Sequence, residues 1–401
     1  MKYLFIFFYI YNACSFHIIN NLALKPIQKL NVTIIGASIS GLSTGIALSK
    51  NGFNVNIYDK AHKIRPSGSA IGFFNNGRAS LKKISNSALK DINQNTLHKT
   101  RNIIYDINNN LIKTENNEFD LTSYWCIQKA LLKQIPSNMI HLNHTFTNYS
   151  IDSNTQNINV VFKDKNINTD ILIGADGIKS RVRDCLFGIK NIYYYDKSIF
   201  RGIVKKENVA NKDLLLRLET DSISWIEEKA GNLFTWREIG GKYMSFTGTK
   251  MHNNNNRIKK YSKKAEIKRI FYDYPLIVND IISEVDDNAI HISGINDINM
   301  CDTWHKNNVM LIGDAAHAMT PGLGMGANVA FEDVAELMHY LKPDKSSITE
   351  NINKWETSRK ERVKEIHSVS REKTIDNNKN RNINNKHYRK FLDNVVKYRP
   401  P

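Results

Sequence analysis

A turn that contains two glycines, together with the acidic residue that follows it, could bind phosphate and sugar groups. Residues 36–41 read G-A-S-I-S-G, after a buried apolar strand and before a helix that begins near Ser40. Gly36 can form a tight turn, and Gly41 lets the helix lie close to the strand, so free N–H groups at the helix start face phosphates. Asp59 ends the next strand, roughly 20 residues further on, where a carboxylate can bind ribose hydroxyls. This combination predicts a dinucleotide site, and the alternative is an ordinary α/β turn.

The middle position of this turn departs from the usual G-x-G-x-x-G pattern, because Ser38 takes the place of the second glycine. The exchange is small enough for a phosphate to tolerate, although it removes some backbone freedom. The candidate binding residues of this first segment are Gly36, Ser38, Ile39, Ser40, Gly41, Asp59 and Lys60.

A second acidic residue stands at the tip of an apolar run in the C-terminal quarter of the chain. Residues 309–312 are apolar, Gly313 and Asp314 follow, and a loop with three further glycines leads into an amphipathic helix from Ala327. A carboxylate at a strand tip suits sugar hydroxyls, and N–H groups at a helix start can stabilise negative charge. The alternative role for Asp314 is an ordinary helix N-cap.

The elements around these segments predict the fold class. Residues 174–183 read G-A-D-G-I-K-S-R-V-R and again run from a strand through a turn into a helix. Between about 190 and 295, short alternating runs separated by glycine-containing turns predict an antiparallel sheet. The α/β pattern then returns, and the residues after about 376 are rich in Asn, Lys and Arg. The sequence therefore predicts an α/β protein with an inserted antiparallel β-sheet domain and C-terminal helices.

The composition indicates a globular protein, since 401 residues with 41 % hydrophobic side chains can fill a core. The net charge of +17 would normally suggest nucleic acid or an anionic membrane as partner. The positive residues are scattered, however, and the abundant Lys, Asn, Ile, Tyr and Phe share A/T-rich codons. We therefore expect no nucleic-acid partner and at most a loose membrane association. The four cysteines form no C-x-x-C pair and no His cluster has metal-ligand spacing, so neither a disulfide framework nor a metal site is predicted.

Residues 1–30 are predicted to be a targeting leader. Lys2 precedes an apolar run at 3–11, small residues follow at 13–15, and no acidic residue occurs before Asp59. The apolar run is too short to span a bilayer. The pattern is similar to the two-part leaders of proteins sent to an organelle, a plastid of secondary origin, through the secretory route. A plain leader for the secretory pathway is the alternative.

The three segments in this order resemble the class A flavoprotein monooxygenases. This is the para-hydroxybenzoate hydroxylase-like family, which includes salicylate hydroxylases and zeaxanthin epoxidase. The third segment contributes G-D-A-A-H-A-M-T-P, and the resemblance extends over about residues 31–370, with F-R-G-I-V at 200–204. It implies a Rossmann-type FAD-binding domain and a substrate-binding β-sheet domain. The expected boundaries are 31–189 and 296–375 for the two parts of the FAD-binding domain, 190–295 for the sheet domain and 376–401 for a polar tail.

The resemblance implies noncovalently bound FAD and no separate nicotinamide domain. It assigns the first segment to the ADP half of FAD, Asp314 to the ribityl chain, and the backbone of residues 324–328 to the flavin ring. The middle segment would lie near the pyrophosphate and NAD(P)H. In this chain Gln128-Lys129 replaces a frequent His-Arg pair near the flavin, and Met325 replaces a frequent glutamine. The further cofactor residues expected are Gln128, Lys129, Asp176, Arg183, Gly313, Asp314, Gly324, Gly326, Ala327 and Asn328.

In such enzymes NAD(P)H reduces the FAD, and O2 then forms a hydroperoxide at flavin C4a that delivers one oxygen atom to an aromatic ring or a double bond. The resemblance therefore implies an enzyme that hydroxylates or epoxidises an aromatic or polyene small molecule. No side chain need act as a nucleophile. His317 could act as an acid or base, but it is more often structural in this motif. Pro321 and Gly322 are better candidates for lining the reaction pocket.

Four aromatic residues in the predicted sheet offer apolar surface, either as a wall of the substrate site or as plain core, and alternation alone does not say which face they take. They are Trp225, Phe234, Trp236 and Tyr243. Flavin halogenases share the expected fold, but their W-x-W-x-I-P signature is missing from this chain. The alternatives to a monooxygenase are an FAD-dependent reductase of the geranylgeranyl reductase type and a non-enzymatic scaffold that keeps the fold.

Overall fold

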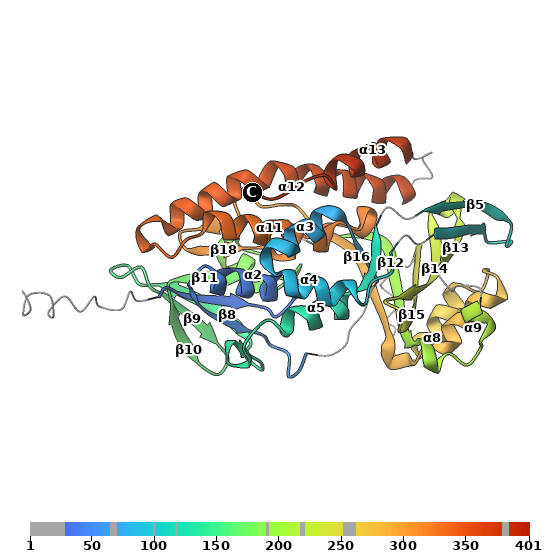
Figure 1. The fold of residues 1–401 in the computed structure, drawn as a ribbon, viewed down its shortest axis with the longest axis horizontal. Coiled ribbons are helices and arrows are strands. Elements are labelled where there is room, and N and C mark those ends of the chain that lie inside the picture. The colour runs from blue at the N-terminus through green and yellow to red at the C-terminus, as the bar shows by residue number, and fades with distance from the viewer. Residues whose placement is uncertain are drawn as a thin grey trace, which may run out of the picture.

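The computed structural model describes residues 29–64, 70–98, 101–116, 119–189, 192–216, 221–251, 262–378 and 385–401. The chain forms two parts that lie side by side, each built on its own sheet, with two helices running along the top in Figure 1. The leader predicted at residues 1–30 lies outside the described residues except for its last two. Among the described helices, none is both long and apolar enough to cross a membrane.

A six-stranded sheet forms the centre of the larger part. The strand order is β17-β18-β11-β1-β2-β7, and of these strands β17 alone runs antiparallel to its neighbour. The central strands are apolar and buried, as parallel strands are when other layers cover both faces of the sheet. The strands are β1 (Asn31–Ile35), β2 (Asn54–Tyr58), β7 (Ile140–His141), β11 (Ile171–Gly174), β17 (His305–Lys306) and β18 (Val309–Leu311).

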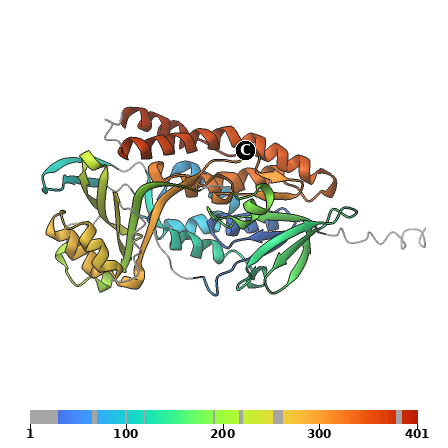
Figure 2. The same cartoon turned by 180° about the vertical axis from the view of Figure 1, so that it is seen from behind.

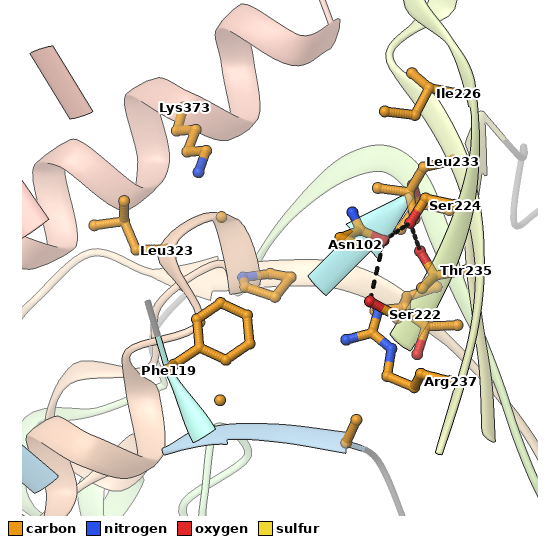
Figure 3. A pocket seen from close by; sticks show the side chains of 18 of the residues that line it. Asn102, Phe119, Ser222, Ser224, Ile226, Leu233, Thr235, Arg237, Leu323 and Lys373 are labelled. Atoms are coloured by element: carbon orange, nitrogen blue, oxygen red, sulfur yellow. Dashed lines mark hydrogen bonds between the residues drawn. The ribbon is translucent and has the colours of Figure 1, made fainter. Parts of the chain in front are cut away.

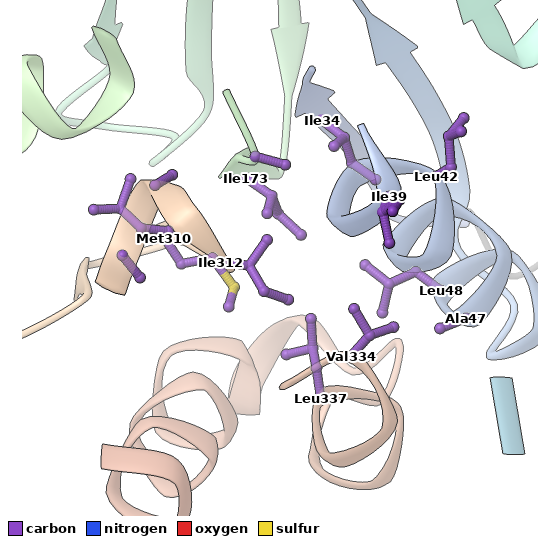
Figure 4. Packing of buried hydrophobic residues seen from close by; sticks show 14 of the residues in the cluster. Ile34, Ile39, Leu42, Ala47, Leu48, Ile173, Met310, Ile312, Val334 and Leu337 are labelled. Carbon is purple, nitrogen blue, oxygen red and sulfur yellow. The ribbon is translucent and has the colours of Figure 1, made fainter. Parts of the chain in front are cut away.

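Helices cover one face of this sheet and a small sheet covers the other (Figure 1). α2 (Ile39–Lys50) and α11 (Gly326–Tyr340) direct Leu48 and Leu337 toward Ile173 and its neighbours in the strands (Figure 4). The opposite layer is an antiparallel sheet of β8 (Phe146–Ile151), β9 (Ile158–Phe162) and β10 (Asn166–Thr169). The shorter elements of this part are β3 (Ala70–Phe73), α3 (Asn75–Ile84), α4 (Asn86–Asn93), β6 (Asp120–Ser123), α5 (Tyr124–Leu132), α6 (Arg181–Phe187) and α10 (Asp314–His317).

A seven-stranded sheet forms the second part, in the order β16-β12-β15-β14-β13-β4-β5. This mostly antiparallel sheet occupies most of the region expected for it and also includes two strands from residues 101–116, which the expected boundaries place in the FAD-binding part. The pairing of β4 with β13 is parallel, whereas the other pairings are antiparallel. The strands are β4 (Arg101–Asp106), β5 (Leu111–Asn116), β12 (Ile192–Lys205), β13 (Asp221–Glu227), β14 (Asn232–Ile239), β15 (Tyr243–Met251) and β16 (Ile290–Ile298).

Helices cover the outer face of the seven-stranded sheet, as Figure 2 shows from behind. They are α7 (Asp213–Leu216), α8 (Lys263–Ile270) and α9 (Leu276–Glu284). Trp225, Phe234 and Trp236 are buried in a second hydrophobic core together with residues of these helices, such as Phe271 and Val278. These three aromatic side chains are therefore core residues of the outer face, which is the second of the two roles that the sequence left open.

The C-terminal residues form two helices that extend over both parts of the molecule (Figure 1). α12 (Ile348–Asn378) is followed by α13 (Asn385–Val395), so the polar tail expected from residue 376 is partly helical. The chain end is also held in place, because Nη2 of Arg362 donates to the carbonyl of Val395 at 2.9 Å and the Arg362 guanidinium lies 4.0 Å from the ring centre of Tyr398. The sequence did not predict these contacts, because a segment rich in Asn and Lys gives no sign of packing.

Candidate active site

The three glycine-containing segments meet at the carboxyl ends of three adjacent parallel strands, β1, β11 and β18. The backbones approach so closely that side chains would collide. A Cβ on Gly36 would lie 2.5 Å from the carbonyl oxygen of Ala175, and a Cβ on Gly313 would lie 2.3 Å from Oγ of Ser40. Ligands of open α/β sheets bind outside the carboxyl ends of the strands. The geometry therefore brings the predicted cofactor segments together at one edge.

The first turn requires glycine at both of its outer positions. Gly36 has a φ of +109°, which L side chains rarely adopt. A Cβ on Gly41 would lie 1.8 Å from the carbonyl oxygen of Gly36. Ser38 has a φ of −76°, so its position needs no glycine, and its hydroxyl donates to the carbonyl of Ala175 at 3.2 Å. The departure from the glycine pattern at Ser38 thus has a structural reason, since serine also caps α2 by accepting the N–H of Gly41.

Asp59 lies beside this turn and is fixed by two backbone N–H groups. Its Oδ2 accepts from Ala37 at 2.7 Å, and its Oδ1 accepts from Ala61 at 2.8 Å. The carboxylate is half-buried, and its other lone pairs can accept further hydrogen bonds from sugar hydroxyls. Lys60 is exposed, and among the described residues its side chain forms no hydrogen bond or ion pair with the turn, so its predicted role is the weaker of the two.

Of the two α5 residues that stand in place of the frequent His-Arg pair, one is buried and the other is exposed. Gln128 is buried, and its Nε2 donates to the carbonyl of Ala37 at 2.9 Å, so Gln128 supports the first turn directly. Lys129 is exposed. Tyr124, at the start of α5, was missed in the sequence. Burial raises the pKa of Tyr124, a hydrogen bond with the backbone of Ile39 opposes this, and the charges of Asp314 and Asp59 raise the pKa further.

The middle segment uses its charged side chains to hold the other segments in place. Asp176 caps α6, because its carboxylate accepts from the Ser180 hydroxyl at 2.5 Å and from the N–H of Arg181 at 2.7 Å. Arg183 is buried, and its Nη1 donates to the carbonyl of Ala315 at 3.0 Å. Arg183 therefore ties this segment to the Asp314 loop. A direct contact of Asp176 or Arg183 with the pyrophosphate or NAD(P)H stays a prediction.

Asp314 and His317 occupy the two ends of the short helix α10 and differ in exposure. Asp314 is exposed at the edge where the segments meet, although the protein atoms around its carboxyl raise its pKa by desolvation. His317 is buried, and its Nε2 lies 2.6 Å from Oδ2 of Asp333 while its ring packs 5.1 Å from that of Trp304. His317 does not line the cavity described below. These contacts favour the structural role over acid or base catalysis for His317.

The start of α11 offers uncapped backbone N–H groups. No side chain caps this helix, and a Cβ on Gly326 would meet no other atom within 4 Å, so open space lies beside it. Gly324 has a φ of +68°, which aims the preceding loop across the helix start. The side chain of Asn328 accepts from the N–H of Phe74 at 3.0 Å and donates to the carbonyl of Gly72 at 2.9 Å, while the expected contact of its backbone with the flavin stays a prediction. It joins α11 to β3, and Ala327 beside it stays half-exposed.

A cavity of about 610 Å³ lies between the two parts of the molecule, within the size range of small-molecule sites. The loop before α11 lines one side, through the 3-10 helix η5 (Pro321–Leu323) and Gly324. The inner face of the seven-stranded sheet lines the opposite side, and α12 and α13 contribute Lys373, Thr374 and Leu392. Figure 3 shows Leu323 and Phe119 across the cavity from Ser222 and Ser224. The predicted lining role of Pro321 and Gly322 agrees with this geometry.

Comparisons with known proteins agree with the site. A family model described as "FAD binding domain" matches residues 29–366. Zeaxanthin epoxidase of Nicotiana plumbaginifolia is 26 % identical over 379 residues, covering 86 % of this chain and 55 % of that protein. The FAD-dependent monooxygenase ptmM of Penicillium ochrochloron is 23 % identical over 384 residues, covering 86 % of this chain and 88 % of that one. The chain thus spans about half the length of the zeaxanthin epoxidases that it matches.

A solved structure shows the same fold. The crystal structure of Klebsiella pneumoniae HpxO complexed with FAD and uric acid superimposes with a TM-score of 0.76, covering 92 % of this chain and 93 % of that chain at 19 % identity. The family match covers most of the chain, and the three segments of the site lie where a dinucleotide binds in such a fold. The chain therefore belongs to the FAD binding domain family, among the class A flavoprotein monooxygenases, and its cofactor is FAD.

Proposed function

We propose that the protein is a monooxygenase that uses NAD(P)H and O2 to insert one oxygen atom into an aromatic or polyene small molecule. In the balanced reaction, substrate, O2, NAD(P)H and a proton give the oxygenated product, NAD(P)⁺ and water. The observation that carries the proposal is the position of the cavity. Its lining includes Pro321, Gly322 and Gly324, which directly precede the uncapped start of α11. A substrate in this cavity would face the place where the flavin ring fits.

The residues at the carboxyl ends of β1, β11 and β18 fit the parts of FAD. Asp59 and the N–H groups that follow Gly36 would hold the ADP half, and the exposed carboxylate of Asp314 would bind ribityl hydroxyls. The open start of α11 can stabilise negative charge on the flavin ring. When bound, the flavin supplies the redox chemistry and the activation of oxygen. The protein would orient the substrate and exclude water from the cavity.

The proposal is tested by an absorbance spectrum of the purified chain and by NAD(P)H oxidation in air, with and without catalase. Flavin bands together with nicotinamide-dependent O2 consumption are expected. Transfer of ¹⁸O from ¹⁸O2 to a product would establish the monooxygenase activity itself. Alkene reduction without O2 uptake would instead favour the reductase alternative, and a colourless protein that FAD cannot reconstitute would favour the scaffold.

For the cell compartment, we infer that residues 1–30 direct the chain to a plastid. The zeaxanthin epoxidase relatives are chloroplastic, and the leader pattern in the sequence is of the two-part type. The test is a fusion of residues 1–30 to a fluorescent protein, viewed in a cell that has a secondary plastid. Plastid fluorescence supports the inference, whereas secretion of the fusion supports the plain secretory leader.

A further inference from the structure

The inner face of the seven-stranded sheet carries a group of polar side chains beside apolar ones such as Ile199 and Leu233, because strand alternation sends the aromatic residues outward. Trp225 and Phe234 pack in the outer core, and the positions next to them in sequence, Ser224 and Thr235, line the cavity. Oγ of Ser224 lies 2.8 Å from Oγ1 of Thr235 and 3.0 Å from Oδ1 of Asn102. Figure 3 shows this hydrogen-bonded group on the sheet side of the cavity. Such a surface favours a polar ligand.

The cavity lining is also strongly positive. Among the described residues that line it, five side chains are cationic and one is a carboxylate. That carboxylate, Glu115, already forms an ion pair with Nζ of Lys113 at 2.8 Å. The other cationic side chains of the lining are Lys197, Arg201, Arg237 and Lys373.

Two arginines of the sheet, Arg201 and Arg237, point to the ligand that this cavity takes. Within the described part of the chain, no hydrogen bond or ion pair is found for the guanidinium of Arg201 or of Arg237, and Nε of Arg237 is buried without an acceptor. Arg237 pairs across the sheet with Ser222 of β13 and Ser245 of β15, and Arg201 of β12 pairs with Thr247. Directly opposed residues share a face of the sheet, so both arginines and these hydroxyl groups face the same side.

The buried arginine of α12 shows the contrast, because carboxylates surround its guanidinium. Arg359 is buried against three carboxylates, with Nη2 2.9 Å from Glu332, Nε 2.9 Å from Asp333 and Nη1 3.1 Å from Glu336. A guanidinium removed from water without an anion is costly. Burial lowers the pKa of Arg237 to about 10, and it lowers the pKa of Lys197 to about 8 despite the nearby Glu227.

We propose that the cavity binds a compact organic anion, a ring that carries a carboxylate or an ionised hydroxyl, whose negative charge lies against Arg237 and Arg201. This inference rests on the proposed function and narrows its substrate class. The serine, threonine and asparagine side chains of the sheet would bind the polar edge of the ring. The opposite edge would then face Pro321 and Gly322, on the flavin side. A neutral polyene would cover both guanidinium groups with hydrocarbon and leave them without an acceptor.

Benzoate and its neutral isostere benzamide test the charge requirement on the holoprotein. Binding is followed by the perturbation of the flavin absorbance spectrum and by the rise in Tm, neither of which requires turnover. The expected result is at least a tenfold lower Kd for benzoate than for benzamide. Equal affinity for the two probes, absence of binding included, would overturn the proposal. The flavin spectrum and NAD(P)H oxidation of the same sample report separately on the proposed function.

Substitutions assign the effect to the sheet arginine. Arg237→Met should reduce the preference for benzoate over benzamide by about tenfold, and Arg237→Lys should keep part of it because the charge is retained. The matched control is Arg269→Met, which removes an arginine from the exposed surface of α8 and should leave the preference unchanged. If Arg237→Met folds, binds FAD and keeps the full preference, then Arg237 is not the anion partner and the proposal is wrong. Should that variant fail to fold, Arg201→Met provides the same test at the second guanidinium.

Discussion

At the scale of single residues, the site separates side chains that bind from side chains that position. Asp59 and Asp314 lie at the edge where three strands end and are not fully buried, whereas Asp176, Arg183 and His317 each form hydrogen bonds to neighbouring protein groups. The sequence motif alone does not make this distinction, because the same charged residue type can bind a ligand or position other protein groups. Exposure and hydrogen-bond partners make it.

Alanine substitutions at two glycines of the predicted FAD site should have different effects on stability. Gly41→Ala places a Cβ against the carbonyl of Gly36, so we expect a loss of about 1–3 kcal/mol in the free energy of unfolding together with loss of FAD. Gly326→Ala points its Cβ into open space, so the apoprotein should keep its Tm while its affinity for FAD falls. Thermal melts of the apoprotein and FAD titrations check both. An unchanged FAD affinity in Gly326→Ala would show that the flavin lies elsewhere.

Arg237→Met should stabilise the protein while it weakens ligand binding. The substitution removes a guanidinium that has no acceptor among the described residues, and an uncompensated buried polar group costs about 1–3 kcal/mol, more when it is charged. We therefore expect a higher Tm for the unliganded variant. The opposite holds for a purely structural arginine, so a lower Tm would indicate that Arg237 has a stabilising contact within the protein.

At the scale of elements, α12 is fixed to α11 by a buried network. Arg359 of α12 contacts Glu332, Asp333 and Glu336 of α11, and Asp333 also contacts His317 of the third segment. Asp333 is fully buried, and although desolvation would raise its pKa, His317 and Arg359 keep that pKa below its ordinary value. The network therefore links the C-terminal helix to the loop that carries Asp314.

Removal of this arginine should be severely destabilising. Arg359→Met removes the cation that three buried carboxylates share, and among the described residues Glu332 and Asp333 keep only Arg362 and His317 as basic partners. Breaking a buried pair in this way typically costs about 3–5 kcal/mol. Lys354→Met is the matched control, because it breaks an exposed pair with Glu350 worth at most about 1 kcal/mol. Denaturant unfolding of the two variants measures the difference. Similar losses in both would mean that the network adds little stability.

A second contact of α12 makes stability depend on pH. Burial alone would raise the pKa of Glu356, but hydrogen bonds from His305 at 2.6 Å, the N–H of Trp304 and Thr303 outweigh it and lower that pKa. The folded pKa lies below the unfolded value of about 4.3, so the stabilisation is fully present above that pH and is lost as pH falls through the folded pKa. The Tm advantage of the natural protein over Glu356→Gln should shrink below about pH 4. A constant difference would contradict this assignment.

The sequence predicted the elements with a strong periodic pattern and missed those without one. The unit from β1 to β2 was predictable because an apolar strand, a glycine turn and a helix follow one another within residues 31–58. β5 was missed because nearly all of its side chains are exposed and no alternation marks it. The face taken by Trp225 was undecidable, because a period of two residues fits either face and only the packing of α8 and α9 selects one.

At the scale of the whole molecule, the cavity is a joint product of segments distant in the chain. The loop of residues 321–324 supplies one wall, strands from residues 101–116 and 192–251 supply another, and Lys373, Thr374 and Leu392 close it from the C-terminal helices. A polar, positively charged cavity on a flavin needs such closure, because water that reaches the reacting centre diverts reduced oxygen from the substrate. The C-terminal helix is the last of these walls.

Removal of residues 385–401 should therefore lower both stability and coupling. The truncation deletes Leu392 from the cavity wall and removes Tyr398, whose ring lies 4.0 Å from the Arg362 guanidinium and whose hydroxyl contacts Glu336. It also frees Lys83, which binds the carbonyls of Pro400 and Pro401. We expect a lower Tm and a larger share of the consumed NAD(P)H appearing as H2O2, measured with and without catalase.

A single substitution controls for the truncation. Lys397→Ala changes an exposed side chain at the same chain end and should alter neither Tm nor the H2O2 share. If the truncated protein releases no more H2O2 than the full chain while its Tm falls, then α13 stabilises the fold but does not keep water from the cavity. If H2O2 rises at an unchanged Tm, then the helix acts as a water barrier alone. We expect both a rise in H2O2 and a lower Tm. Leu392 lines the cavity, and Tyr398 holds the chain end to α11 and α12.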